Sequence, residues 1–353
     1  MSTVSTPDWV VAHARAQQRM FRWGERAHRW LPRRLHPRAS ALIGQVFSPE
    51  LPQAVKIWSA LQQFTQCSDA QAHEWLARWL ANQGALAIEL HDYPQLDANW
   101  ARHEVHCSEG ERDVLADIAA RGGLVITCHS HHHNRLGAFL GVSGTAVWGI
   151  AGPEETSLWQ PWTARYVRKI NGGSEAHFGG GRYLFIDDMR GLLRESRAAL
   201  QRGETVVNLA DGPQDSPTAV PVELAGRRLD MARALIDLAV DVGAPVRFAM
   251  FYSDLQGRHR CRLASASPNI GAGDVAHEYA AQLMRWCADE PYAWQGFAWW
   301  DDLPFIAEPG AALQARRADA QQRFAASRPS PTWALRAMHG LGSAELRFAP
   351  PQP

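Results

Sequence analysis

The sequence predicts an α/β fold with a mainly parallel or mixed central sheet flanked by helices, preceded by an N-terminal helical extension. Of its 353 residues, 46% are hydrophobic and 20% are charged, a composition that can bury a large core. Helical periodicity dominates up to about residue 95, and from Trp100 onward strand-like and helix-like segments alternate. Such alternation is typical of helices packed on both faces of a sheet. We therefore expect a helical subdomain at 1–95, an α/β domain at 96–328 and a Pro/Ala-rich tail at 329–353.

The first predicted helix runs from Pro7 to Leu31 and is strongly basic. Pro7 suits a first helical turn, and Pro32 ends the helix. Its arginines recur at alternating spacings of four and three, beside an apolar face. The arginines are Arg15, Arg19, Arg22, Arg26 and Arg29. The apolar face consists of Met20, Trp23, Ala27, Trp30 and Leu31, with the tryptophans at its boundary. Two interpretations remain open: a solvated helix packed on the domain, or a helix that docks on an anionic membrane surface or an acidic carrier protein.

Two capping boxes mark the starts of later helices. The first, Ser68 to Gln71, opens the second of two further N-terminal helices, which are expected at about 51–64 and 69–88. The other, Ser108 to Glu111, follows a short strand near 103–107 and starts a helix that ends at Arg121.

The remaining segments alternate between strand and helix. Strands are expected at 124–128, 146–150, 205–209 and 246–252, and helices at 155–170, 188–202 and 229–242. Two short strands, at 220–224 and 258–263, are expected to be antiparallel, the second because it follows a turn at Gln256 and Gly257.

Charge, cysteine spacing and hydropathy exclude several classes of protein. The 36 basic residues equal the 36 acidic ones, so the chain lacks the net positive charge of a general nucleic-acid binder. The five cysteines are scattered without C-x-x-C spacing, which favours a reducing compartment. The sequence contains neither a run of about 18 apolar residues nor the apolar core of a signal peptide. We expect a cytoplasmic protein. The basic helix is also compatible with a peripheral position at the inner face of the cytoplasmic membrane.

The densest chemical signal is a histidine cluster directly after the predicted strand at 124–128. It comprises His129, His131, His132 and His133, and it lies where ligands bind in open α/β sheets, at the end of a strand. Three interpretations arise: zinc ligands, histidines without a chemical role, or a catalytic base with its neighbours. Metallohydrolases with a His-x-His-x-Asp-His motif need Asp at 133 and His at 134, and this sequence has His133 and Asn134. The pattern therefore favours a base without a metal.

The histidine cluster belongs to a longer series of motifs. His129 is followed five positions later by Asn134, as in a His-x-x-x-x-Asp/Glu motif in which the last residue is changed. The other members are Gly122 to Thr127, Asp187 to Leu193, Leu200 to Glu204, Leu209 to Pro213, Gly243 to Val246 and Glu290 to Trp300. In this order, over about residues 50–305, the chain resembles the lysophospholipid acyltransferase superfamily, and within it the lipid A biosynthesis (lauroyl/myristoyl) acyltransferase branch.

The resemblance implies that 96–328 is an acyltransferase-like catalytic domain with His129 as general base. Asn134 stands where the family has the carboxylate that orients the base, and an amide oxygen can fix the tautomer but carries no charge. The loop with Asp211 and Gly212 is implied to bind substrate, and backbone amides near Ala210 to Gly212 are the expected donors to the oxyanion.

One family feature is missing, the arginine associated with phosphate-bearing acceptors. Ile186 occupies its position, and Arg182 and Arg190 are the nearest candidates to bind substrate instead. Because arginine is suited to bidentate recognition of phosphate, this replacement argues against a phosphorylated acceptor.

The resemblance therefore implies an acyltransferase, and we expect it to need neither metal nor cofactor. Acyl transfer from a thioester requires a base for the proton of the acceptor, and histidine titrates nearest neutral pH. We expect an acyl carrier protein or acyl-CoA as donor and a hydroxyl or amine as acceptor. Two alternatives remain: a catalytically reduced relative that binds an acyl chain or carrier domain without turnover, and a metal-dependent hydrolase that uses the cluster from His129 to His133.

Overall fold

The computed structural model describes residues 8–47, 51–152, 161–212, 218–254, 257–300 and 303–306. The chain forms two compact units. Among the described residues, the first comprises 8–47, 51–91 and 161–166, and the second comprises 92–152 and the residues described from 167 onward. The sheets lie in the second unit, whereas the first unit is helical in the part that the structure describes.

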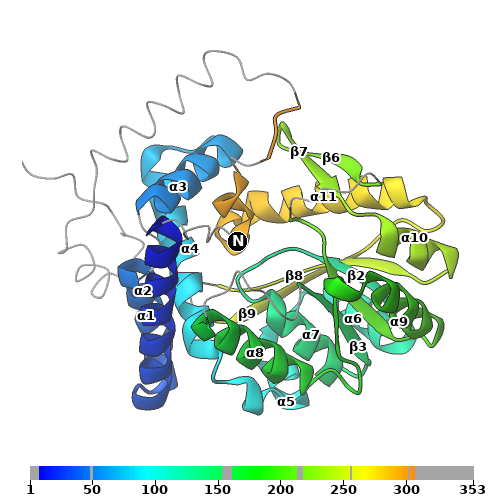
Figure 1. The fold of residues 1–353 in the computed structure, drawn as a ribbon, viewed down its shortest axis with the longest axis horizontal. Coiled ribbons are helices and arrows are strands. Elements are labelled where there is room, and N and C mark those ends of the chain that lie inside the picture. The colour runs from blue at the N-terminus through cyan, green and yellow to red at the C-terminus, as the bar shows by residue number, and fades with distance from the viewer. Residues whose placement is uncertain are drawn as a thin grey trace, which may run out of the picture. The chain divides into compact units, whose positions relative to one another are not determined.

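Four helices lie wholly within the described part of the first unit (Figure 1, blue to cyan). They are α1 (Asp8–Trp30), α2 (His36–Phe47), α3 (Leu51–Thr65) and α4 (Asp69–Glu89). Helix α4 contacts each of the other three. Glycines allow the close approach of α2, because a Cβ on Gly44 would lie only 1.7 Å from the carbonyl oxygen of Leu80. The predicted helices at 7–31, 51–64 and 69–88 are confirmed, while α2 is absent from the sequence-based predictions although Pro37 suits its first turn.

The second unit is built around a mixed sheet that has seven strands among the described residues, in the order β1-β9-β8-β2-β5-β3-β4. The strands are β1 (Val105–His106), β9 (His259–Ser265), β8 (Val246–Ser253), β2 (Gly123–Thr127), β5 (Thr205–Leu209), β3 (Val147–Ala151) and β4 (Tyr183–Phe185). Strands β8 and β9 pair antiparallel, and the other neighbouring pairs are parallel. The predicted α/β fold class is confirmed.

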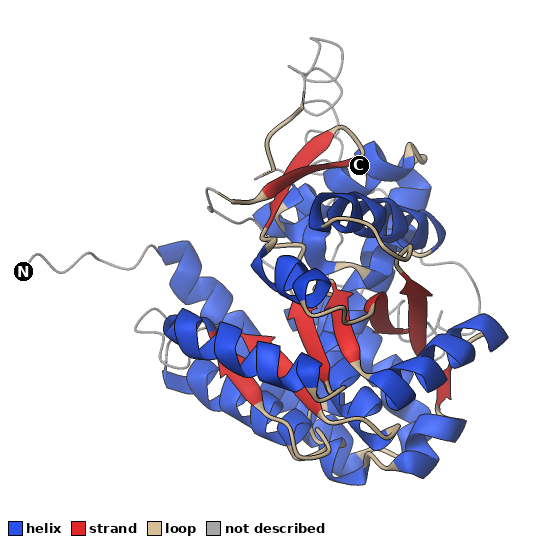
Figure 2. Ribbon diagram, turned by 90° about the vertical axis from the view of Figure 1, so that its right-hand side faces the viewer, coloured by secondary structure: helices blue, strands red, loops and turns tan. Residues whose placement is uncertain are grey.

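Helices cover both faces of this sheet (Figure 2). Helices α6 (Glu109–Arg121) and α7 (His133–Val142) pack on one face together with α5 (Ala98–His103). On the other face lie α9 (Met189–Gln201), α10 (Ala234–Asp241) and α11 (Ala272–Asp289). The remaining described helix, α8, runs from Pro161 to Glu175. Short 3₁₀ turns occur at 33–35, 93–95, 186–188, 291–293 and 295–298.

Several details agree with local sequence signals. The capping box at the start of α6 is present, because Ser108 accepts from the backbone of Glu111 and the Glu111 carboxylate accepts from the Ser108 N–H at 2.6 Å. All five cysteines are free thiols. Within the described residues, no helix combines the length and the apolarity needed to span a bilayer.

The predicted helix at 229–242 is wrong in its first part. Strands β6 (Val220–Leu224) and β7 (Arg227–Met231) form a hairpin, and α10 begins only at Ala234. The two residues between the strands, Ala225 and Gly226, have φ values of 48° and 81°, as a tight hairpin turn requires. The antiparallel strand at 220–224 is confirmed.

Other predictions fall partly or wholly outside the described residues. Of the predicted helix at 155–170, residues 155–160 lie outside them, and α8 continues beyond 170 to Glu175. The predicted tail at 329–353 also lies outside them. Strand β4 and helix α11 have no counterpart among the predicted elements.

Candidate functional site

Two neighbouring parallel strands bring His129 and Asp211 together. In the register of β2 and β5, Thr127 pairs with Leu209, so His129 and Asp211 each lie two residues beyond the last paired position. The Ala210 N–H donates to the Thr127 carbonyl at 3.0 Å and extends the pairing to the edge of the sheet. The two side chains therefore meet where open α/β sheets bind ligands.

The sequence of β2 explains why this edge is well defined. All five residues of β2 are buried, which an apolar run between two helix-covered faces requires. Gly123, with φ of 120°, begins the strand where a Cβ would lie 2.3 Å from the Pro245 carbonyl oxygen. Only glycine fits this close approach, and it fixes the position from which the chain runs to His129.

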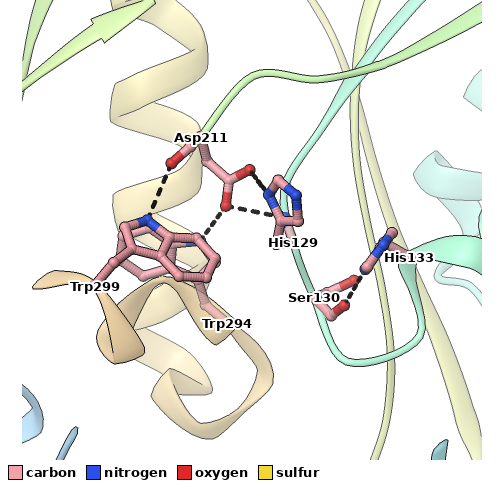
Figure 3. Close-up of polar contacts among 6 residues, drawn as sticks. All are labelled: His129, Ser130, His133, Asp211, Trp294 and Trp299. Carbon is pink, nitrogen blue, oxygen red and sulfur yellow. Dashed lines mark hydrogen bonds and ion pairs between the residues drawn. The ribbon is translucent and has the colours of Figure 1, made fainter. Parts of the chain in front are cut away.

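Asp211 holds both the backbone and the ring of His129 (Figure 3). The His129 N–H donates to both carboxylate oxygens, at 3.0 and 2.9 Å, and Nδ1 of the ring lies 2.7 Å from Oδ1. Asp211 is fully buried, whereas the His129 side chain is 34% exposed. Within the described residues, Nε2 of His129 has no hydrogen-bond partner in the protein, so this nitrogen is available to a substrate.

Two tryptophans complete the surroundings of Asp211. Trp294 is buried and donates from Nε1 to Oδ2 of the carboxylate at 2.6 Å, and Trp299 donates from Nε1 to the Asp211 carbonyl at 3.4 Å. The ring of Trp299 meets the ring of His129 edge to face, with 5.4 Å between centroids. The segment that carries both tryptophans also contacts the main chain of the base, because the Gln295 N–H donates to the His129 carbonyl at 2.8 Å.

The pKa values of His129 and Asp211 move in opposite directions. Burial favours neutral His129, but the attraction of the Asp211 carboxylate and their hydrogen bond outweigh it, so the pKa of His129 is raised. Burial also favours neutral Asp211, but the His129 charge and the hydrogen bonds from His129 and Trp294 outweigh it, so the pKa of Asp211 is lowered. Both shifts favour the charged form of the group, so the imidazolium of His129 and the ionised carboxylate of Asp211 stabilise each other.

The other histidines of the cluster differ from His129. His133 donates from Nδ1 to the Ser130 carbonyl at 2.7 Å, and its burial, with the charge of nearby His129, lowers the pKa of His133 to about 4. Burial lowers the pKa of His131 well below its usual value, and His132 packs against His259 with 6.1 Å between ring centroids. The neutral His133 ring lies 5.3 Å from that of His129 and forms one wall of the site.

Asn134 is not the residue that contacts Nδ1 of His129. It is the second residue of α7, and its backbone carbonyl accepts a hydrogen bond from the Ser174 hydroxyl at 2.5 Å. The contact that the motif spacing assigns to Asn134 is made by Asp211 instead. Asp211 is expected from the sequence to bind substrate, and in the structure it is fully engaged with His129, Trp294 and Trp299.

Gly212 lies next to the base, as the sequence predicts for this loop. A Cβ on Gly212 would lie 3.8 Å from Cε1 of His129. Of the backbone amides expected as oxyanion donors, that of Ala210 already donates to the Thr127 carbonyl, which leaves the amides of Asp211 and Gly212 as the candidates. Residues 213–217 lie outside the described residues.

Arg182 and Arg190 are not brought to His129. Arg182 immediately precedes β4 and is level with Trp148, near the amino ends of the strands, whereas His129 follows the carboxyl end of β2. The guanidinium of Arg182 lies 5.7 Å from the centre of the Trp148 ring. Arg190 follows the carboxyl end of β4 and is exposed. Because β5 and β3 separate β4 from β2, this strand lies about 14 Å from the strand that carries His129. Ile186, also after β4, is 45% exposed.

The described residues contain no group of three or more His, Cys, Asp or Glu side chains arranged to hold a metal. Nδ1 is engaged in both His129 and His133, by Asp211 and by the Ser130 carbonyl. The Ser130 hydroxyl donates to the Phe251 carbonyl, so this serine does not face Nε2 of His129. The site therefore offers a base without a neighbouring hydroxyl or thiol nucleophile from the described part of the chain.

Sequence reasoning missed the roles of Trp294 and Trp299. Both lie in the Trp-rich segment near the end of the motif series, but nothing in their spacing indicates that an indole N–H faces a carboxylate 83 residues away.

Comparison with protein-family models and with curated proteins finds no match for this chain.

Proposed function

We propose that this protein is an acyltransferase in which His129 acts as the general base. It moves an acyl group from a thioester donor, an acyl carrier protein or acyl-CoA, to a hydroxyl or amine. The observation that carries the proposal is the contact of Asp211 with Nδ1 of His129 at 2.7 Å, which directs Nε2 to an exposed position. A histidine held in this way takes a proton from a bound acceptor, because the carboxylate fixes the tautomer and stabilises the imidazolium.

The absence of a neighbouring nucleophile in the described residues favours direct transfer over a covalent acyl-enzyme. In a Ser-His-Asp hydrolase the ring nitrogen opposite the carboxylate bonds to a serine hydroxyl. Here Nε2 has no such partner among the described side chains, so the proton that it takes belongs to the acceptor. The acceptor oxygen or nitrogen attacks the thioester carbonyl, the oxyanion collapses, and the thiolate leaves and takes up a proton from His129. The backbone amides of Asp211 and Gly212 are the candidate donors to the oxyanion.

The alternative of a catalytically reduced relative rests on Asn134 and Ile186. The charge that Asn134 lacks is supplied by Asp211, so the change at 134 does not by itself remove base catalysis. Ile186 remains a difference that bears on the acceptor, and it favours one without a phosphate at that position.

The test uses dodecanoyl-CoA as donor and ethanolamine as a minimal acceptor that carries both a hydroxyl and an amine. Mass spectrometry of the acylated product measures turnover by the full chain, with and without a chelator. We expect His129→Ala to lower turnover by about 10²–10⁴-fold. His106→Ala, at an exposed histidine of β1, is the matched control and is expected to be unchanged. Wild-type turnover in His129→Ala would overturn the proposal, and loss of turnover with chelator would favour the metal-dependent hydrolase.

A further inference from the structure

Helix α1 packs against α2 and α4 of the first unit through one face that contains no tryptophan. Met20, Phe21, Gly24 and Ala27 are buried on this face, and α1 contacts α2 and α4 (Figure 1). A Cβ on Gly24 would lie 2.3 Å from the Ala87 carbonyl oxygen, so glycine lets α1 lie directly on the backbone of α4. Small and apolar residues therefore account for the packing of this helix.

The opposite face carries both the arginines and the tryptophans. Trp23 is 47% exposed and Trp30 is 73% exposed, far more than packing against α2 or α4 would leave. The exposed basic residues on or just after this face are Arg19, Arg22, Arg26, Arg29, Arg33 and Arg34. The sequence places the two tryptophans at the boundary of the apolar face, and in the structure Met20 and Ala27 of that face are buried whereas the tryptophans are exposed. The side chain of Arg15 lies outside the described residues.

The charges of this outward face are not neutralised by the described residues. Arg19, Arg22, Arg26 and Arg29 form no ion pair with any carboxylate of the described part, and Glu25 is the acidic residue among them. Two of the guanidinium groups instead lie over the exposed indoles, Arg26 over Trp23 and Arg29 over Trp30, each 5.3 Å from a ring centre. Unpaired arginines beside exposed indoles form a surface that suits an anionic and partly apolar partner.

We propose that the outward face of α1 (Arg19, Arg22, Trp23, Arg26, Arg29 and Trp30) binds the surface of an anionic phospholipid bilayer. The arginines meet the phosphates of the headgroups, and the two indoles enter the boundary between headgroups and acyl chains, where tryptophan is favoured. Over about twelve residues this face is roughly 18 Å long, so the helix lies parallel to the surface. An acidic protein would account for the arginines but not for two indoles that are 47% and 73% exposed. This proposal does not depend on acyl transfer.

The test measures co-sedimentation of the full chain with vesicles of phosphatidylcholine, with or without phosphatidylglycerol. We expect binding to the anionic vesicles alone, weakened by added salt. Changing Arg19, Arg22, Arg26 and Arg29 to Gln is expected to weaken binding by roughly 10²–10³-fold, from about fivefold per arginine. Changing the same residues to Lys is expected to retain most binding. The matched control removes four exposed arginines of the second unit, Arg102, Arg194, Arg197 and Arg285, and is expected to stay within about twofold of wild type.

The tryptophans separate a lipid surface from an acidic protein. Trp23→Ser together with Trp30→Ser keeps every charge, and we expect at least tenfold weaker binding to the anionic vesicles. Wild-type affinity in this double variant would overturn the proposal, because charge alone would then suffice, as for an acidic protein. Equal loss in the α1 variant and the matched control, or no binding of intact protein at low salt, would also overturn it. Circular dichroism of each variant confirms that it is folded, and the salt dependence of the unmodified protein tests the charges without any substitution.

Discussion

Replacing Asp211 with asparagine removes the charge next to His129 and keeps the size of the side chain. Asp211 accepts hydrogen bonds from the His129 N–H, from Nδ1 of the same ring and from Nε1 of Trp294. An asparagine has a single acceptor oxygen, so its NH₂ group must face Trp294 or His129. If it faces Nδ1, the ring proton moves to Nε2 and the nitrogen that faces substrate is no longer a base.

The structure sets the size of the expected effect. Two unit charges about 4 Å apart attract by about 4 kcal/mol at an effective dielectric constant near 20. His129 is 34% exposed, so solvent screens the pair, and we assign about 1–3 kcal/mol to stabilisation of the imidazolium. At about 1.4 kcal/mol per factor of ten, this charge contributes roughly 10–10² in rate. Loss of the correct tautomer adds to it, because the same change in a Ser-His-Asp triad costs about 10⁴. We expect Asp211→Asn to lower turnover by about 10²–10⁴-fold.

Two assays check this prediction, and one of them needs no substrate. NMR titration of labelled histidines, with His129 assigned from the spectrum of His129→Gln, is expected to show that Asp211→Asn moves the pKa of His129 downward. The reason is that burial then acts without the opposing carboxylate. Turnover of dodecanoyl-CoA with ethanolamine supplies the second readout. Asp254→Asn, which changes a buried carboxylate paired with Arg258, is the matched control. A folded Asp211→Asn protein with an unchanged His129 titration and turnover within about threefold of wild type would refute the reasoning.

Four further predictions concern the same site. Trp294→Phe removes a donor to the buried carboxylate, so we expect it to lower the free energy of unfolding in urea by about 1.5–3 kcal/mol; an unchanged midpoint and slope would contradict this. Because the base must be neutral, kcat/KM is expected to rise with pH through the raised pKa of His129, above its usual 6.5, and in Asp211→Asn this rise is expected at lower pH. The same pair stabilises the fold most between the usual pKa values of 3.8 and 6.5; its contribution is lost as pH falls through the lowered pKa of Asp211 or rises through the raised pKa of His129, which urea unfolding across pH measures. Asn134→Asp is expected to leave turnover within about threefold, since Nδ1 already has a carboxylate partner, and a tenfold gain would show that Asp211 does not fill that role.

The part of the site that lies within one segment could be predicted from the sequence. The apolar run that becomes β2 ends at the histidine cluster, and the end of a buried strand predicts a ligand-binding edge. The capping box at Ser108 likewise fixes the start of α6. These signals are local, because neighbouring residues alone determine hydrogen bonds at a helix start and the burial pattern of a strand.

The partner of His129 could not be predicted, because it depends on strand order. Asp211 lies 82 residues away, and it meets His129 only because β5 inserts between β2 and β3. Motif spacing pointed instead to Asn134, which shares a segment with His129. Helical periodicity has a similar limit in α1, where it groups Trp23 with Met20 but does not tell which of them faces α4.

The position of the carboxylate explains how the site keeps a base despite the amide at Asn134. Asp211 binds the backbone N–H of His129 as well as Nδ1 of its ring. The same residue thus fixes the main chain that carries the imidazole and the direction in which Nε2 points. Its burial is costly unless donors compensate for it, and His129 and Trp294 supply them. Since charge and orientation both come from the end of β5, position 134 is not needed for either, and the proposed base catalysis depends on the pair of His129 with Asp211.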